Sequence, residues 1–131
     1  ARAAVMANFF DSIEVAPGVH ANGEFTLGEN IADHGGLQVS YQAFKKATAA
    51  APLKIENGFT PEQRFFLSYA NVWAGNIRPE EILKRTKTDP HSLGKWRVDG
   101  ALPQIGAWYE AFNITEKDPM YLPVDKRVSI W

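Results

Sequence analysis

The sequence predicts a mainly α-helical fold with long loops. Apolar residues recur at helical spacing in several segments, and no segment alternates apolar and polar residues over the length of a typical strand. Glycine, proline and asparagine separate these segments, as they do in loops. With 131 residues, the chain is long enough for one domain with a modest core.

Composition excludes several classes of function. The net charge is −1 and the sequence pI is about 6.3, so no basic excess favours nucleic-acid binding. No apolar run is long enough for a transmembrane helix. The chain has no cysteine, which excludes disulfides, thiol catalysis and cysteine-based zinc sites.

The first two helices are predicted from their apolar faces and from the loop between them. An alanine-rich helix is expected at residues 2–13, followed by a loop at 16–23 that contains proline and glycine. A second helix is expected at 28–48, because its apolar residues follow the period of a helix. These residues are Leu37, Tyr41, Phe44 and Ala47.

The third helix has the clearest beginning. Thr60 suits the N-cap, Pro61 suits the first helical position, and Gln63 would complete a capping box. One apolar face then follows at helical spacing. It consists of Phe65, Phe66, Tyr69, Val72 and Trp73.

The remaining segments are shorter. A fourth helix is expected at 79–86 and a fifth from Pro103, with a loop at 88–100 between them because of its proline and glycines. The tail is expected to be extended and rich in turns. Only residues 95–100 and 126–131 are candidates for short strands.

The second helix places Glu29 and Asp33 four residues apart, on one face. The simplest interpretation is two solvated acids near the helix N-terminus, which fits Asp33 less well because the dipole effect fades after the first turn. Gly35 and Gly36 then cost roughly 2 kcal/mol of helix stability together. Such a cost suggests close packing against another helix, where a carboxylate could ligate a metal.

The chain does not contain the remaining ligands of a zinc site in a recognisable pattern. Catalytic zinc usually has three protein ligands, and no HExxH motif is present. The histidines are His20, His34 and His91, and His34 should point away from the face that carries Glu29. A complete zinc site within this chain is therefore not expected.

The segment GENIADHGG resembles the third-ligand motif of the neprilysin and endothelin-converting-enzyme family of zinc metallopeptidases. Further stretches resemble the same family in the same order, from about residue 9 to Trp131. They are ANGEFTLGENIAD, FTPEQRFFLSYANVWAG with IRPEE, TDPHSLGKWRVDGAL, and DPMYLPVDKRVSIW.

This resemblance implies a fold and a place in a longer chain. Residues 1–131 would form one partial domain, the helical C-terminal part of a thermolysin-like (gluzincin) catalytic domain that begins after the HExxH helix. Trp131 resembles the family's C-terminus. The resemblance also implies an extracytoplasmic protein, and the lack of cysteine suggests a bacterial member.

The resemblance assigns candidate catalytic and metal-binding roles. Glu29 corresponds to the third zinc ligand, and Asp33 to the acid that orients a zinc-binding histidine. His91 corresponds to the histidine that stabilises the oxyanion, and Asp89 to the acid that orients it. For His91, the alternative is an idle, solvated side chain.

The candidate substrate-binding residues are Arg97, Val72 and Trp73. Arg97 corresponds to an arginine that binds a substrate carbonyl, and its alternative is a surface salt bridge. Val72 and Trp73 correspond to residues of a hydrophobic substrate pocket, and their alternative is packing in the core. Leu93 replaces a common proline of the family, which could loosen the loop that carries His91.

The predicted parent protein is a zinc endopeptidase that cleaves peptides of modest size before a hydrophobic residue. The chain alone is predicted to be inactive and to bind zinc weakly, because it holds one zinc ligand of three and lacks the general base. Its partner would be the N-terminal remainder of the polypeptide, which carries HExxH. An exposed apolar face could also cause self-association. The alternatives are a helical interaction module derived from the peptidase fold and a purely structural subdomain.

Overall fold

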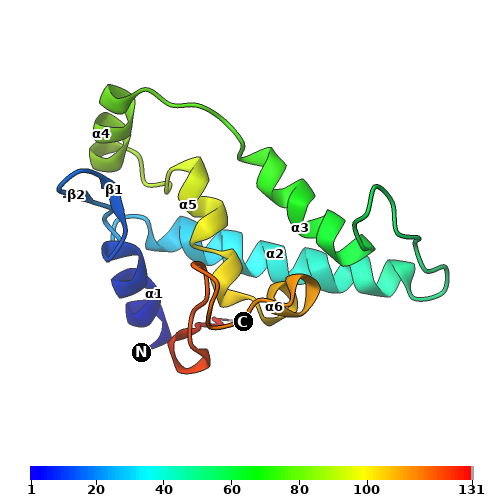
Figure 1. The fold of residues 1–131 in the computed structure, drawn as a ribbon. Coiled ribbons are helices and arrows are strands. Elements are labelled where there is room, and N and C mark those ends of the chain that lie inside the picture. The colour runs from blue at the N-terminus through cyan, green and yellow to red at the C-terminus, as the bar shows by residue number, and fades with distance from the viewer. Residues whose placement is uncertain (131) are drawn as a thin grey trace.

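The computed structural model describes residues 1–130 and consists mainly of helices (Figure 1). The α-helices are α1 (Arg2–Asp11), α2 (Leu27–Thr48), α3 (Pro61–Val72), α4 (Pro79–Thr88), α5 (Gly94–Asp99) and α6 (Gly106–Phe112). Short 3-10 helices are η1 (Leu102–Gln104) and η2 (Val124–Lys126), and one hairpin joins β1 (Glu14–Ala16) to β2 (Val19–His20). Trp131, predicted to match the family's C-terminus, lies outside the described residues. No described helix is long and apolar enough to cross a membrane.

The predicted beginning of the third helix is confirmed in detail. The backbone N–H of Gln63 donates to Thr60 Oγ1 at 3.2 Å, and the N–H of Thr60 donates to Gln63 Oε1 at 3.0 Å. This capping box satisfies donors that the first turn would otherwise leave unpaired. It fixes where α3 begins and therefore which of its residues face the core.

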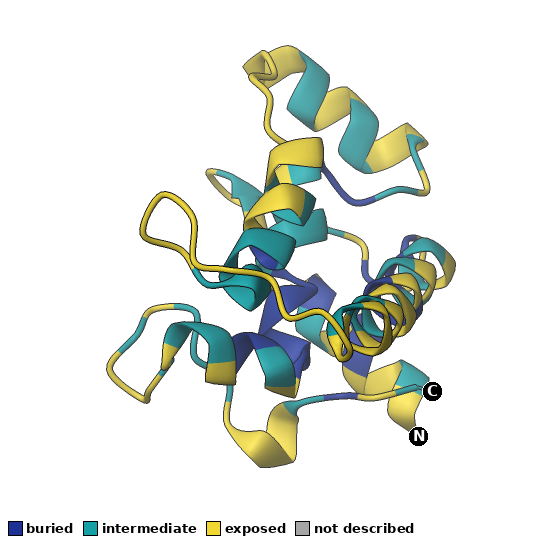
Figure 2. Cartoon of the chain, turned by 90° about the vertical axis from the view of Figure 1, so that its right-hand side faces the viewer, coloured by how far each residue is buried: buried dark blue, intermediate teal, exposed yellow. Residues whose placement is uncertain are grey.

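The core has two parts (Figure 2, dark blue). The larger joins α2, α3, η1 and α6 through Leu37, Phe66, Leu102, Ile105, Trp108 and Tyr109. The smaller joins α1 to the tail through Met6, Phe10, Ile13 and Val128. Aromatic rings extend the larger part along α2, where Tyr41 stacks on Phe66 with ring centroids 5.2 Å apart. Burial of these apolar surfaces fixes α2, which carries both predicted acids.

Two local predictions were wrong. The segment 88–100 was expected to be a loop with a candidate strand at 95–100, but residues 94–99 form α5. Tertiary contact explains the difference, since Tyr69 Oη donates to the carbonyl of Arg97 at 2.9 Å. A Cβ atom at Gly94 would lie 2.9 Å from the carbonyl oxygen of Trp73, so only glycine allows this close approach. The described part of the other candidate strand, 126–130, contains no strand.

The hairpin of β1 and β2 was also not predicted. Its strands contain three and two residues, which is too short for an alternating pattern to show. Gly18 has a φ of +72°, a value that favours glycine in the turn between the strands. The hairpin packs against α4 through β1, and it thereby supports the segment that leads into His91.

The buried His34 predicts a pH-dependent stability. Its side chain is fully buried on α2, and its Nε2 lies 3.1 Å from Gln38 Nε2. Burial lowers the pKa of His34 below its ordinary value of 6.5. The unfolded chain therefore takes up a proton near pH 6.5 that the folded chain takes up only at lower pH. We expect the free energy of unfolding to fall as the pH decreases below 6.5.

Urea unfolding of the 131-residue chain between pH 5 and 7.5 tests this expectation, with His34→Gln as the comparison. The variant should lose less stability on acidification than the unmodified chain, whatever its stability at pH 7.5. Parallel pH dependences of the two proteins would contradict the assignment to His34.

Candidate active site

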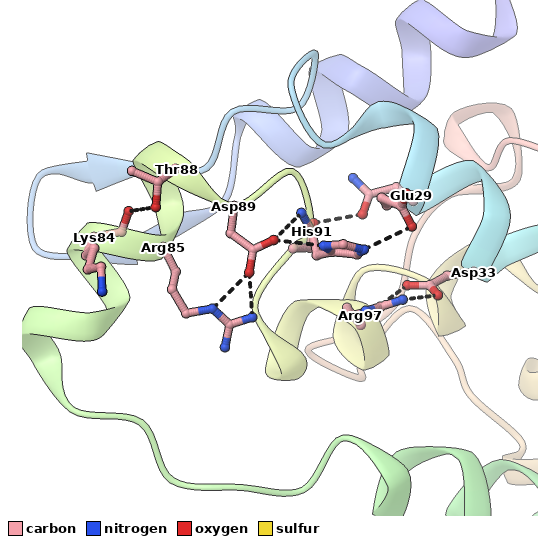
Figure 3. Close-up of polar contacts among 10 residues, drawn as sticks. Glu29, Asp33, Lys84, Arg85, Thr88, Asp89, His91 and Arg97 are labelled. Atoms are coloured by element: carbon pink, nitrogen blue, oxygen red, sulfur yellow. Dashed lines mark hydrogen bonds and ion pairs between the residues drawn. The ribbon is translucent and has the colours of Figure 1, made fainter.

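The two acids of α2 lie on one face of the helix, and each is paired with a side chain from the segment 89–97 (Figure 3). Glu29 lies in the first turn, where the N-terminus of a helix stabilises a negative charge. Asp33 follows one turn later, and its side chain is 13% exposed. The interpretation of Asp33 as a solvated acid is therefore wrong.

Glu29 begins a chain of polar contacts that runs through His91 to Asp89. Glu29 Oε2 lies 3.3 Å from His91 Nε2, and Asp89 Oδ1 lies 2.8 Å from His91 Nδ1. Asp89 Oδ1 also accepts the backbone N–H of His91 at 3.0 Å. These hydrogen bonds from His91 are the main reason why the pKa of Asp89 falls to about 2. Both ring nitrogens of His91 therefore face carboxylates, although its side chain is 41% exposed.

Asp33 forms the second arrangement, a bidentate ion pair with Arg97. Arg97 Nε donates to Asp33 Oδ2 at 2.7 Å, and Arg97 Nη2 donates to Asp33 Oδ1 at 2.6 Å. The exposed fractions of the two side chains are only 15% and 13%, and the carboxylate raises the pKa of Arg97. The guanidinium also lies over the Trp73 ring, 3.8 Å from its centroid. Arg97 is thus salt-bridged, as its alternative interpretation held, although the pair is largely buried.

The two residues predicted to line a pocket differ in burial. Val72 is 69% exposed, so it does not pack in the core. Trp73 is partly buried and stacks with Arg97. Both contribute to a pocket of 620 Å³ between the end of α3, α4 and α5, whose lining also includes Arg97, Ile82 and Trp96.

Sequence reasoning missed the residues that hold the His91 segment against α2. Ser92 Oγ donates to Asn30 Oδ1 at 2.7 Å, and Asn30 Nδ2 donates to Thr26 Oγ1 at 3.0 Å. All three side chains belong to buried residues. Asn30 lies between the two acids in sequence, and a polar residue on the inner side of a helix was the available signal. Its hydrogen bonds satisfy polar groups that would be costly to bury unpaired.

Leu93 is packed into the protein within this segment. Its φ of −59° is one that proline also adopts, and its side chain is only 8% exposed. The neighbouring Ser92 is fixed by Asn30. Packing and one buried hydrogen bond therefore hold the backbone where the family commonly has proline.

Carboxylate oxygens are suitable zinc ligands. The side chain of Glu29 is 44% exposed, so its carboxylate is accessible. The described residues contain no group of three or more histidine, aspartate or glutamate side chains arranged to hold a metal ion. Glu29 therefore fits the role of a single ligand, and the described chain offers no full set around it.

Comparison with known proteins identifies the family. The model of peptidase family M13 matches residues 1–128. The chain is 38% identical to human neprilysin over 123 residues, which is 92% of this chain and 16% of neprilysin. It is 40% identical to bovine endothelin-converting enzyme 1 over 106 residues, which is 79% of this chain and 14% of that enzyme.

Two solved structures of bacterial proteins share the fold. The Mycobacterium tuberculosis zinc metalloprotease Zmp1, in complex with an inhibitor, has a TM-score of 0.93 and 31% identity, over 99% of this chain and 21% of Zmp1. PepO from Lactobacillus rhamnosis has a TM-score of 0.79 and 32% identity, over 99% of this chain and 19% of PepO. The predicted mainly helical peptidase fold is thus confirmed. Because the family model extends along almost the whole chain and these relatives share its sequence and its fold, the chain belongs to peptidase family M13.

Proposed function

We propose that this chain is the C-terminal part of a zinc-dependent endopeptidase that hydrolyses peptide bonds in small and medium-sized peptides. The chain spans 14–21% of the length of the neprilysin, endothelin-converting enzyme and Zmp1 sequences that it matches. The observation that carries the proposal is the convergence of Glu29 and Asp33 with His91 and Arg97 on one face of α2. Glu29 would be one ligand of a single zinc ion, and the remainder of the polypeptide would provide the HExxH ligands and the general base.

Zinc bound there would supply an activated water molecule and polarise the substrate carbonyl. His91 Nε2 would donate a hydrogen bond to the oxygen that becomes negatively charged during attack. Asp89 holds the opposite side of the His91 ring, so that Nε2 is the nitrogen directed towards Glu29. This arrangement provides a positioned donor next to the proposed metal ligand.

Arg97 and Asp33 each keep hydrogen-bonding capacity that their ion pair does not use, and this capacity can serve the further roles that we propose. Asp33 engages Nε and Nη2 of Arg97, which leaves Nη1 to bind a substrate carbonyl. The two oxygens of a carboxylate can accept about four hydrogen bonds. Asp33 can therefore hold Arg97 and also orient a zinc-binding histidine from the remainder of the polypeptide. Val72 and Trp73 would contact the hydrophobic side chain that follows the cleaved bond.

The test compares the 131-residue chain with the full-length protein. The full-length protein should cleave a hydrophobic model peptide in a zinc-dependent, chelator-sensitive manner, whereas the chain alone should show no turnover. Zinc-dependent turnover by the chain alone would overturn the inactivity, and inactivity of the zinc-loaded full-length protein would overturn the peptidase function. Family resemblance further supports an extracytoplasmic parent, and fractionation of the source cells would test the location. The lack of cysteine is the argument for a bacterial member.

The alternative function is a non-catalytic helical interaction module. The upstream coding sequence discriminates between the two, because an in-frame HExxH motif supports the peptidase. Neither candidate involves nucleic acid, in agreement with the net charge of −1.

Self-association of the isolated chain is a further expectation. Large apolar side chains are strongly exposed, including Val39, Ile55, Val72 and Val124 at 65–72%. Apolar side chains favour association where they form a contiguous exposed patch. Sizing chromatography over a range of concentrations should show dimers or larger species, and a clean monomer at high concentration would contradict this.

Substitution of Gly36 tests whether a helix from the remainder of the polypeptide packs against α2. We propose that Gly35 and Gly36 provide clearance for the HExxH helix. Gly35 is buried within the chain, whereas a Cβ atom at Gly36 would meet nothing within 4 Å. Gly36→Ala should therefore stabilise the 131-residue chain by roughly 1 kcal/mol, because alanine favours the helix.

In the full-length protein the same substitution should lower the melting temperature, since the new methyl group would contact the neighbouring helix. Thermal unfolding of both proteins gives the comparison, with the isolated chain as the control. Equal stabilisation of the chain and the full-length protein would contradict the clearance at Gly36.

A further inference from the structure

Arg85 lies outside the predicted set of site residues, yet it contacts that set directly (Figure 3). It lies in the last turn of α4, and its guanidinium reaches the residue at which the helix ends, Asp89. Arg85 Nε and Nη2 both donate to Asp89 Oδ2, at 3.0 Å and 2.9 Å. Both donors converge on a single oxygen, so the guanidinium fixes the position of Oδ2 with two charge-assisted hydrogen bonds.

The two oxygens of Asp89 have separate partners. Oδ2 accepts both hydrogen bonds from Arg85, while Oδ1 accepts Nδ1 and the backbone N–H of His91 at 2.8 Å and 3.0 Å. Asp89 has left the helical conformation, with φ of −104° and ψ of 122°, although its backbone N–H still donates to the carbonyl of Arg85 at 2.9 Å. Arg85 is therefore the side chain that holds the outer oxygen of this carboxylate while the inner oxygen holds the imidazole.

We propose that Arg85 is a positioning residue, which fixes the Asp89 carboxylate so that the His91 ring directs Nε2 towards Glu29. This inference rests on the proposed peptidase function. It differs from an ordinary ion pair on a helix surface, which would contribute little to stability and nothing to catalysis. Because Arg85 acts through Asp89, its effect must depend on the Asp89 carboxylate.

The experiment uses the zinc-loaded full-length protein and a fluorogenic peptide. Arg85→Ala should lower kcat about 10-fold to 100-fold, the usual effect of removing the partner of a group that orients a site, with little change in KM. Arg85→Lys should restore part of the activity, because an ammonium supplies the charge but only a single-point contact. Lys84→Ala is the matched control, since Lys84 lies one residue away, is 69% exposed, and should leave kcat unchanged.

A double-mutant cycle separates positioning from a general structural effect. In an Asp89→Asn background, Arg85→Ala should cause little further loss of kcat. An equal loss in the two backgrounds, a change confined to KM, or an unchanged kcat in Arg85→Ala would each overturn the inference.

Crystal structures distinguish failure of the Arg85 inference from failure of the proposed peptidase function. If the unmodified full-length protein does not cleave peptides, the structures of the unmodified protein and of Arg85→Ala still test the geometry. A His91 ring that keeps its Asp89 contact in Arg85→Ala overturns the inference, and a ring that loses this contact supports it.

Discussion

Replacement of Asp33 by alanine should destabilise the 131-residue chain by about 2–3 kcal/mol. The change deprives Arg97, whose side chain is only 15% exposed in the unmodified chain, of its bidentate partner. Removal of one member of a buried ion pair costs about 3–5 kcal/mol, and the residual exposure of this pair reduces that value. Urea unfolding at pH 7.5 measures the difference.

The matched control is the exposed pair of Lys45 and Glu62, whose side chains are 51% and 29% exposed. Lys45→Ala should cost less than about 1 kcal/mol, because water screens this pair. The double substitution of Asp33→Leu with Arg97→Met should recover much of the stability lost in Asp33→Ala, since it leaves no unpaired charge. Equal costs for Asp33→Ala and Lys45→Ala would contradict the importance that we assign to burial.

Replacement of His91 by alanine should lower kcat of the zinc-loaded full-length protein by about 10²–10³-fold. This is the usual cost of removing one positioned donor to a developing oxyanion. KM should change little, because the interaction forms mainly in the transition state. Steady-state kinetics on a hydrophobic model peptide measure both constants.

His20→Ala is the control, since His20 is exposed in the hairpin and, among the described residues, its ring contacts only the backbone carbonyl of Asp11. It should retain the kcat of the unmodified protein. A His91→Ala variant with unchanged kcat, or with a loss only in KM, would exclude His91 from transition-state stabilisation.

The long helices were predictable because their signals are local. The capping residues Thr60 and Gln63 lie three positions apart, and the apolar face of α2 repeats with the helical period. The short elements were not predictable in the same way. Segment 94–99 begins with a glycine and follows Pro90 by four residues. It becomes a helix where Gly94 packs closely on Trp73 and Tyr69 donates to the Arg97 carbonyl.

In the candidate site, too, some features were predictable from the sequence and others depended on tertiary contacts. Resemblance to the family selected Glu29, Asp33, His91 and Arg97, but their mutual contacts could not be read from the chain. Asn30 was missed although it lies on the inner side of α2, because its partner Ser92 is 62 positions away in the sequence. Arg85 was missed because its partner Asp89 lies just beyond the end of the helix.

The sequence by itself determined the helical class, the capping of α3 and the placement of Glu29 and Asp33 on one helix face, since each depends on residues within one or two turns. Only the tertiary structure decided that His91 faces Glu29 and that Arg97 pairs with Asp33. Arg97 and Asp33 are 64 positions apart, so their contact depends on how α2, α3 and α5 pack. Burial of apolar surface sets that packing, and it is a property of the whole chain.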